Sequence, residues 1–327
     1  MQQYVIAAHK KQGSNRVQRG IFETLVHICH EYRISSTFGL FLAFSGSKAL
    51  TRIADGSQAS LVISPGTSSF DGLLATAHAL ADRAGAVILP HFRTDFTIDH
   101  KGGDLFDPVT AADRAAEMAV RETLAELRPS HGILGEEFGT LRADAEYCWI
   151  VDPIDGTRAF IIGQPLWGTL IGLRRGSVPV LGLMDQPFVG ERFFSGEREA
   201  FIRRGGTTRP MRTRSCPSLG DALLTASSPD LFTTDEEREG FDRLAREVRL
   251  RRFGGDCYNY CLLALGQIDL VVEAGLKTYD ILPVIPIIER SGGIVTTWNG
   301  GDASDGGRIL AAGDKRLHDA ALEVLSG

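Results

Sequence analysis

The chain has 327 residues, a formal net charge of −6 and a sequence pI of about 5.8, which argues against a nucleic-acid binder that relies on a basic surface. Its length can bury one large domain or two subdomains, and this charge is too mild for a disordered chain. Five cysteines without regular spacing fit reduced thiols better than a disulfide framework, so a cytoplasmic location is expected. We find no apolar stretch approaching the ~20 residues that span a membrane, so no membrane partner is expected.

Residues 1–69 read as an N-terminal extension, because their periodicity is poor and they close with a Ser-, Pro- and Gly-rich segment. After Met1 the next methionine is Met118. One hypothesis is a misassigned start, with a non-AUG start codon read here as Leu61 or Val62. The alternative is a genuine, partly ordered extension, and intact-mass spectrometry of the native protein separates the two.

From residue 70 onward the hydrophobic pattern becomes regular. The predicted helices are 70–89, 110–127, 236–248, 254–265, 281–290 and 317–325, and Pro286 should kink the fifth of them. The predicted strands are 133–134, 147–151, 166–173, 178–184, 192–194, 200–203, 222–226, 268–273, 293–297 and 309–312. Helices and strands mix without strict βαβ alternation, which indicates an α+β fold with layered sheets.

The stretch from Trp149 to Thr157 is the most informative part of the chain, because an apolar run ends there in two carboxylates three residues apart. Pro153 should hold Asp152 in an extended conformation. Asp155 follows one turn later, so both carboxylates can reach a shared point. The carbonyl of Ile154 lies between them as a neutral oxygen ligand. Such a group favours a cation, and hard oxygen ligands suit Mg²⁺ better than zinc.

The same stretch also predicts a phosphate site. Gly156 permits a tight turn, and the amides of Gly156 and Thr157 would face an anion at the start of a helix. Two metal ions ~4 Å apart could hold an attacking water and a leaving oxygen in line. The alternative is that Asp-Pro-x-Asp-Gly forms only a surface turn.

Further acidic residues extend this pattern. Glu136 stands upstream in Gly-Glu-Glu-Phe-Gly, and Asp113 precedes it in Pro-Val-Thr-Ala-Ala-Asp. Asp280 comes much later, in Tyr-Asp. Carboxylates placed just after apolar strands are costly unless cations neutralise them. Asp280 and Asp256 could instead be helix N-caps.

Together these motifs resemble the inositol-monophosphatase superfamily of Mg²⁺-dependent phosphatases. The matching stretches are 135–137, 152–157, 273–280 and 291–293, and the resemblance covers about residues 70–327. It implies a layered αβαβα sandwich, with a phosphatase domain over 70–327. That domain would divide into a metal-binding subdomain, 70–210, and a C-terminal α/β subdomain, 211–327. It also implies two or three Mg²⁺ ions per site and a homodimer.

Within that superfamily the chain most resembles the histidinol-phosphate phosphatases. The stretches that carry this are 155–161, 165–171, 185–187, 254–258 and 275–280, although that branch more often has proline where Thr278 stands. Inositol phosphatases usually carry Thr-Asn-Phe after Asp-Gly-Thr, and Arg158 departs from that pattern.

The resemblance implies roles for single residues. The metal ligands would be Glu136, Asp152, the Ile154 carbonyl, Asp155 and Asp280. Thr157, paired with Asp113, would orient the attacking water, with Glu136 as the third catalytic residue. The residues implied to contact the substrate are Lys101, Gly156, Thr157, Arg158, Asp256, Asn259 and Glu273.

These observations favour hydrolysis of histidinol phosphate in histidine biosynthesis. An acidic pocket built from Asp256 and Glu273 would suit a substrate that carries an amine and an imidazole. The nearest alternative is an inositol monophosphatase or a broad sugar-phosphate phosphatase, ahead of nucleotide 3′-phosphatase and fructose-bisphosphatase activities. A hypothesis of another class is a regulatory binding partner of transcription machinery. Full cellular function of Asp152→Asn protein would favour it.

Overall fold

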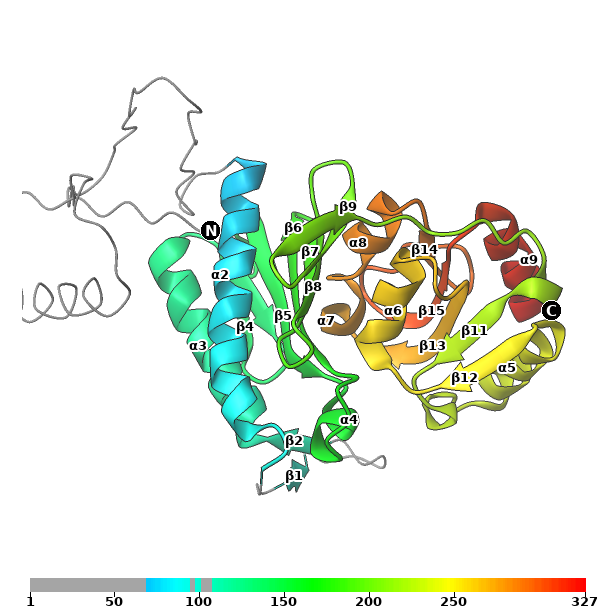
Figure 1. Ribbon diagram of the computed structural model, residues 1–327, viewed down its shortest axis with the longest axis horizontal. Coiled ribbons are helices and arrows are strands. Elements are labelled where there is room, and N and C mark those ends of the chain that lie inside the picture. Colours follow the sequence, from blue (N-terminus) through cyan, green and yellow to red (C-terminus); the bar gives the residue numbers. More distant parts are fainter. Residues whose placement is uncertain (1–68, 95–97, 101–107) are drawn as a thin grey trace, which may run out of the picture. The chain divides into compact units, whose positions relative to one another are not determined.

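The computed structural model describes residues 69–94, 98–100 and 108–327, with side chains left out between 98 and 109 (Figure 1). The extension predicted over 1–69 therefore lies outside the described residues, except for Ser69. Ser69 caps the first described helix, α2 (Phe70–Ile88), because its side chain accepts a hydrogen bond from the Gly72 amide. Helix α3 (Ala111–Leu127) packs beside α2, and these two helices form an outer layer.

Beneath these helices lies a mixed sheet in the order β10-β9-β8-β7-β6-β5-β3-β4. Its strands are β3 (Gly132–Gly135), β4 (Gly139–Leu141), β5 (Tyr147–Asp155), β6 (Gly168–Arg175), β7 (Val178–Gln186), β8 (Glu191–Ser195), β9 (Ala200–Arg204) and β10 (Thr207–Pro210). From β5 to β10 the strands form an antiparallel meander, whereas β3 and β5 are parallel. The predicted 166–184 hairpin is therefore confirmed as β6 and β7.

A second sheet follows in the order β12-β11-β13-β15-β14. Its strands are β11 (Leu223–Ala226), β12 (Leu250–Phe253), β13 (Leu270–Leu276), β14 (Ile294–Thr297) and β15 (Gly307–Ala312). Helices α6 (Asp256–Ala264), α7 (Thr278–Ile281) and α8 (Ile285–Arg290) lie between the two sheets, and α5 (Asp235–Glu247) and α9 (Lys315–Ser326) cover the far face (Figure 1). This helix–sheet–helix–sheet–helix order confirms the predicted αβαβα sandwich.

Three large apolar cores and one small cluster, formed by Cys148, Ile150 and Leu282, pack the layers of the described residues. One packs α2 and α3 on the first sheet around Leu80 and Trp149, and both of these side chains are fully buried. The second fills the space between the sheets, and the third lies under α5 and α9. The segment 70–91 is long enough and apolar enough to cross a membrane, with a mean hydropathy of 1.2, which the sequence analysis does not anticipate. Half of that stretch is buried, as in an ordinary core helix.

The smaller elements complete the chain. They are the pair β1 (Ile98–His100) and β2 (Pro108–Thr110), helix α4 (Thr157–Ile161), and 3₁₀ turns at Leu89–His91, Leu219–Asp221 and Pro229–Leu231. The sequence analysis does not predict β1, β2, β4, β10 or β12. These are short strands, and the side chains of β10 and most of β12 are exposed. Without a buried face, β10 and β12 lack the alternation that predicts a strand.

The predicted helix 281–290 is wrong as a single element. The chain forms two short helices, α7 and α8, and breaks between them at Pro283. Pro286 kinks nothing, because it lies in the first turn of α8, where the amides have no intrahelical partner. The break packs on two glycines of the first sheet. A Cβ on Gly172 would lie 2.8 Å from Leu282 Cδ2, and a Cβ on Gly182 would overlap the Pro283 carbonyl.

Candidate active site

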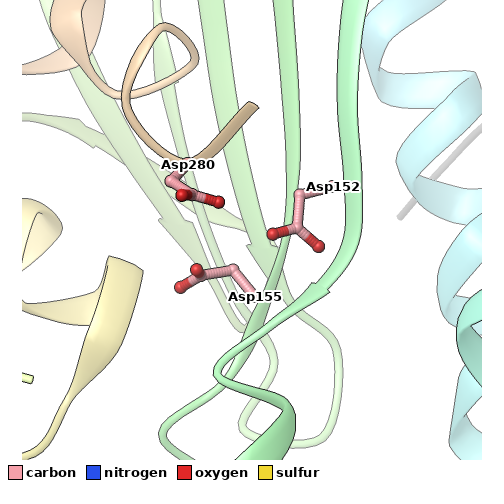
Figure 2. Close-up of side chains that lie close together, drawn as sticks. All are labelled: Asp152, Asp155 and Asp280. Carbon is pink, nitrogen blue, oxygen red and sulfur yellow. The ribbon is translucent and has the colours of Figure 1, made fainter. Parts of the chain in front are cut away.

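Three carboxylates from two distant parts of the chain meet between the sheets (Figure 2). Asp152 and Asp155 come from the end of β5, and Asp280 comes from α7. One oxygen of each carboxylate lies within 4.8 Å of the other two. The structure therefore brings together three of the predicted metal ligands.

An irregularity in β5 puts Asp152 and Asp155 on the same side. Residues three apart in a regular strand point to opposite faces of the sheet. Here the register against β6 shifts between these two residues, as it does at a β-bulge, so that both carboxylates point toward Asp280. The predicted strand 147–151 is too short, since β5 continues to Asp155.

Asp280 is not the N-cap of the helix, because it is the third residue of α7 and Lys277 is the N-cap. Its carboxylate accepts a hydrogen bond of 2.7 Å from the Lys277 amide at the start of α7, which is a capping interaction. The same carboxylate faces Asp152 and Asp155 (Figure 2). The cap therefore fixes the position of the third carboxylate.

Glu136 joins the group from the turn after β3. Its amide donates to the Val151 carbonyl at 3.1 Å, which holds the turn against β5. Its side chain hydrogen-bonds with Asp152, and its charge raises the pKa values of Asp152, Asp280 and Asp113. The predicted ligand Glu136 thus lies beside Asp152 and close to Asp280.

The pKa values of the clustered carboxylates show that their negative charges are not compensated within the protein. Burial, followed by repulsion from Glu136, Asp155 and Asp280, raises the pKa of Asp152 well above its usual range. Burial raises the pKa of Asp280 to about 7, against the favourable effect of the Lys277 charge. Repulsion of this kind is relieved when a divalent cation binds and replaces the protons. The oxygen-only donors fit Mg²⁺.

The turn after the carboxylates is built as predicted. Gly156 has φ of +82° and caps α4, which begins at Thr157. A Cβ at Gly156 would lie 3.0 Å from the Leu166 carbonyl oxygen and 3.2 Å from the Asp256 Cβ, so only glycine fits without displacing neighbours. The first-turn amides of α4 have no intrahelical acceptor, as a phosphate cradle requires.

The predicted pairing of Thr157 with Asp113 is absent from the structure. The Thr157 hydroxyl donates to the Ile154 carbonyl at 3.0 Å. Asp113 instead accepts from the amide and the hydroxyl of Thr110, at 2.8 and 2.5 Å, because it completes the capping box of α3. The role of this pair in orienting water therefore stays a prediction. It requires the Thr157 hydroxyl to rotate away from Ile154, whose carbonyl is the predicted neutral metal ligand.

The predicted substrate contacts fall into two groups. Asp256 packs against Gly156, and burial raises its pKa to about 6, against the opposing effects of a hydrogen bond from Ser227 and the positive charge of Arg158. These residues lie beside the metal cluster, and Lys101 lies outside the described residues.

Glu273 and Asn259 form the second group and have protein partners. The Glu273 carboxylate is buried and accepts from the amide and hydroxyl of Ser227 and from Tyr260 Oη at 2.8 Å. Asn259 Nδ2 donates to the Gly254 carbonyl. In the described structure both residues support the site, and direct contact with a substrate stays a prediction for each.

Sequence analysis misses Glu117, which holds the Glu136 turn. Its fully buried carboxylate accepts from the amides of Glu137 and Phe138 at 2.7 and 3.2 Å and from Arg121 Nε at 2.8 Å. A signal was present, because Glu117 lies four residues after Asp113 on the same helical face. Cys257 is also missed, and its amide donates to the Asp155 carboxylate at 2.6 Å.

Known proteins are similar to this chain in sequence and in fold. A family model described as the inositol monophosphatase family matches residues 70–326. The chain is 42% identical over 269 residues to "Bifunctional phosphatase IMPL2, chloroplastic" of Arabidopsis thaliana, which covers 79% of this chain and 76% of the relative. It is 38% identical over 262 residues to the histidinol-phosphatase of Mycobacterium tuberculosis, covering 79% and 99%.

Solved structures agree with these relatives. An inositol monophosphatase from Zymomonas mobilis superimposes with a TM-score of 0.71 at 43% identity, covering 80% of this chain and all of that chain. The chain belongs to the inositol monophosphatase family and is a phosphatase. The family is metal-dependent, in agreement with the acidic cluster.

Proposed function

We propose that the chain is a Mg²⁺-dependent phosphate monoester hydrolase whose substrate is histidinol phosphate. The observation that carries the substrate assignment is the Asp256 carboxylate, which packs on Gly156 beside the predicted phosphate cradle. A carboxylate there can pair with the cationic amine of an amino alcohol. The histidinol-phosphatase of Mycobacterium tuberculosis, 38% identical to this chain, supports the same assignment.

Each part of the site has a task in this proposal. The ligands Glu136, Asp152, Asp155 and Asp280, with the Ile154 carbonyl, would hold Mg²⁺. Bound Mg²⁺ supplies charge stabilisation to the phosphate group and to the leaving oxygen, and it lowers the pKa of water.

The protein's own groups place the substrate around those ligands. The amides at the start of α4 orient the phosphate oxygens, because their donors point out of the first turn. Thr157, once its hydroxyl turns from Ile154, orients the attacking water. Asp256 fixes the organic part of the substrate at the opposite side of Gly156.

The test compares phosphate release from L-histidinol phosphate and from inositol 1-phosphate at matched concentrations with Mg²⁺. We expect a preference of about a hundredfold in kcat/KM for histidinol phosphate, which is about 2.7 kcal/mol of transition-state discrimination. Asp256→Asn should remove most of that preference while leaving the inositol ester nearly unaffected. Asp144→Asn, at an exposed position outside the site, is the matched control.

A second candidate is inositol monophosphatase activity, which the Zymomonas mobilis structure favours at 43% identity. Equal rates on the two esters, or a preference for the inositol ester, would support it and overturn the histidinol phosphate assignment. A loss of both activities in Asp256→Asn would show that Asp256 supports the metal site and does not select the substrate. A homodimer is part of the proposal, and sedimentation velocity of the purified chain tests it.

A further inference from the structure

Ser227 follows directly after strand β11, at the carboxyl end of the parallel strands of the second sheet (Figure 1). Strand β11 pairs in parallel with β12 on one side and with β13 on the other. The chain after β11 leads to α5 on the far face of this sheet, whereas the chain after β13 leads to α7 between the sheets. Open parallel sheets bind ligands where the connections leave in opposite directions in this way. Ser227 therefore lies at a position where a substrate group is expected.

The hydroxyl of Ser227 serves two carboxylates. It donates to Glu273, and the Asp256 carboxylate also accepts a hydrogen bond from it. A hydroxyl carries a single proton, so it can donate to only one of the two carboxylates at a time. Glu273 has two other donors, the Ser227 amide at 2.8 Å and Tyr260 Oη at 2.8 Å. Glu273 therefore stays hydrogen-bonded when the hydroxyl turns to Asp256.

The backbone of Ser227 holds the turn that carries Asp256. The Gly254 amide donates to the Ser227 carbonyl at 2.9 Å, and Asn259 Nδ2 donates to the Gly254 carbonyl at 3.1 Å. Asp256 itself has φ of +43°. A non-glycine residue at positive φ persists only where its surroundings hold it. Ser227 thus contacts both the turn before Asp256 and the Asp256 carboxylate.

The Asp256 carboxylate lies against the start of the predicted phosphate cradle. A Cβ on Gly156 would lie 3.2 Å from the Asp256 Cβ and 3.2 Å from its Oδ2. A carboxylate that rotates freely binds a cation less tightly, because ordering it costs conformational entropy. A hydrogen bond from Ser227 restricts this rotation and leaves further lone pairs of the carboxylate to a ligand.

We propose that Ser227 is a positioning residue that holds the Asp256 carboxylate toward the cationic amine of the substrate, and that it is thereby a determinant of substrate selectivity. This role rests on the proposed function, because a substrate without a cationic group would not need Asp256 in a fixed direction. Among the described residues, the hydrogen bonds of the Ser227 hydroxyl go to Glu273 and Asp256 and not to a predicted metal ligand. Loss of the hydroxyl should therefore weaken binding of the amine and leave the chemical step unchanged.

The test measures kcat and KM for L-histidinol phosphate and for inositol 1-phosphate at saturating Mg²⁺. We expect Ser227→Ala to raise the KM for histidinol phosphate about five- to tenfold, as the loss of one hydrogen bond does. Its kcat, and both constants for the inositol ester, should stay within about twofold of the wild-type values. Ser227→Thr keeps a hydroxyl and should restore the wild-type KM. Ser228→Ala is the matched control, because the hydroxyl of this neighbouring serine accepts from the Asp230 amide and caps the following turn.

A double-mutant cycle shows whether Ser227 acts through Asp256. In Asp256→Asn protein the amine has lost its carboxylate, so adding Ser227→Ala should change the KM for histidinol phosphate by less than about twofold. A further rise in KM as large as that in the wild-type background would overturn the proposal, since Ser227 would then act through Glu273 or on the substrate itself.

Other results would also overturn the role of Ser227. An equal rise of KM for both esters in Ser227→Ala, or a higher Mg²⁺ requirement, would make this serine a structural support of the whole site. A wild-type preference for histidinol phosphate that Ser227→Ala retains would leave the proposed function standing and refute the role of Ser227 alone. A wild-type chain that prefers the inositol ester would refute the substrate assignment, and the role of Ser227 with it.

Discussion

Two groups of charged side chains at the first sheet differ in how they are neutralised. At one, Asp185 on β7 lies against Arg192 on β8, with Nε 2.6 Å from the Asp185 carboxylate, and Arg192 Nη2 also reaches Asp82 on α2 at 2.7 Å. At the other, none of Asp152, Asp155 and Asp280 forms an ion pair among the described residues. In both groups the removal of charges from water costs free energy, and only in the first group is this cost offset by ion pairs within the chain.

This difference separates a structural charge from a functional one. The Arg192 group joins α2 to the sheet, and burial lowers the pKa of the neighbouring His78 to about 3, so that this imidazole stays neutral. In the other group, the carboxylates of Asp152, Asp155 and Asp280 repel one another, and a cation from solution would neutralise them. An isolated set of buried carboxylates is therefore a better indicator of the active site than burial or charge alone.

The largest expected effect comes from Asp155→Asn. We expect kcat/KM to fall about a thousandfold or more, since a metal ligand is lost, while the melting temperature without metal stays equal or rises because repulsion is relieved. Phosphate release and differential scanning calorimetry measure the two quantities. A variant that keeps wild-type activity would show that Asp155 is not a ligand.

Arg192→Met should remove the ion pairs that Arg192 forms with Asp185 and Asp82. It leaves Asp185 buried without a partner, and we expect the free energy of unfolding to fall by about 3–5 kcal/mol. Urea denaturation measures this, and the stabilisation by Mg²⁺ should persist in the variant. Arg175→Met, which removes an exposed pair with Glu146, is the control and should have no measurable effect. Equal effects of the two substitutions would refute the contrast between the groups.

The pH dependence of Mg²⁺ stabilisation sharpens the comparison. Burial raises the pKa values of Asp280 and Glu273 to about 7, so the folded metal-free protein binds more protons than the unfolded chain between about pH 4 and pH 7. Its stability therefore falls as pH rises through that window. We expect the gain in the free energy of unfolding on adding Mg²⁺, measured by urea denaturation, to increase from pH 5 to pH 8, toward about 2.7 kcal/mol at a hundredfold excess over Kd.

Taking the difference with and without Mg²⁺ at each pH removes the titration of His78, which acts in the opposite direction. The low pKa of His78 gives stability that is complete above its unfolded value and is lost as pH falls toward 3. A gain on adding Mg²⁺ that does not change between pH 5 and pH 8 would contradict the proton competition.

The smallest effect is expected for Glu117→Gln. The substitution weakens the acceptor that holds the amides of Glu137 and Phe138, at a cost of about 1–3 kcal/mol. Because this turn carries Glu136, we expect the Mg²⁺ concentration for half-maximal activity to rise several-fold while kcat at saturating Mg²⁺ changes little. Glu122→Gln, exposed on the same helix, is the control. A fall in stability with unchanged Mg²⁺ dependence would leave Glu117 a purely structural residue.

The sequence predicts local features of the site better than long-range ones. Gly156 at positive φ and Thr157 at the start of a helix follow from a few adjacent residues, and the structure confirms both. The meeting of Asp280 with Asp152 depends on the layering of two sheets, which no local pattern encodes, and only the family resemblance predicted it. The predicted Thr157–Asp113 pairing is not formed in the described structure, where Asp113 accepts hydrogen bonds from Thr110 as part of the capping box of α3, and its role stays a prediction.

The fold shows the same division. Amphipathic helices such as α2 and the strands with a buried face were predicted within a few residues, because burial imposes a period on the sequence. Strand β12, with Arg251 and Arg252 at a sheet edge, shows no such period. The break at Pro283 depends on the glycines facing it, which lie about a hundred residues earlier in the chain.

Those glycines fix the distance between α7 and the first sheet, and so the position of Asp280. Gly182 has no room for a side chain because the Pro283 carbonyl occupies that space, and Pro283 lies three residues beyond Asp280. A methyl group there would push α7 away from β5 and so widen the gap between Asp280 and the two aspartates of β5, where metal ions are proposed to bind. The substitution Gly182→Ala would therefore change the size of the cation that fits the site best. It would shift the preference of the protein among cations without altering any of the predicted ligands.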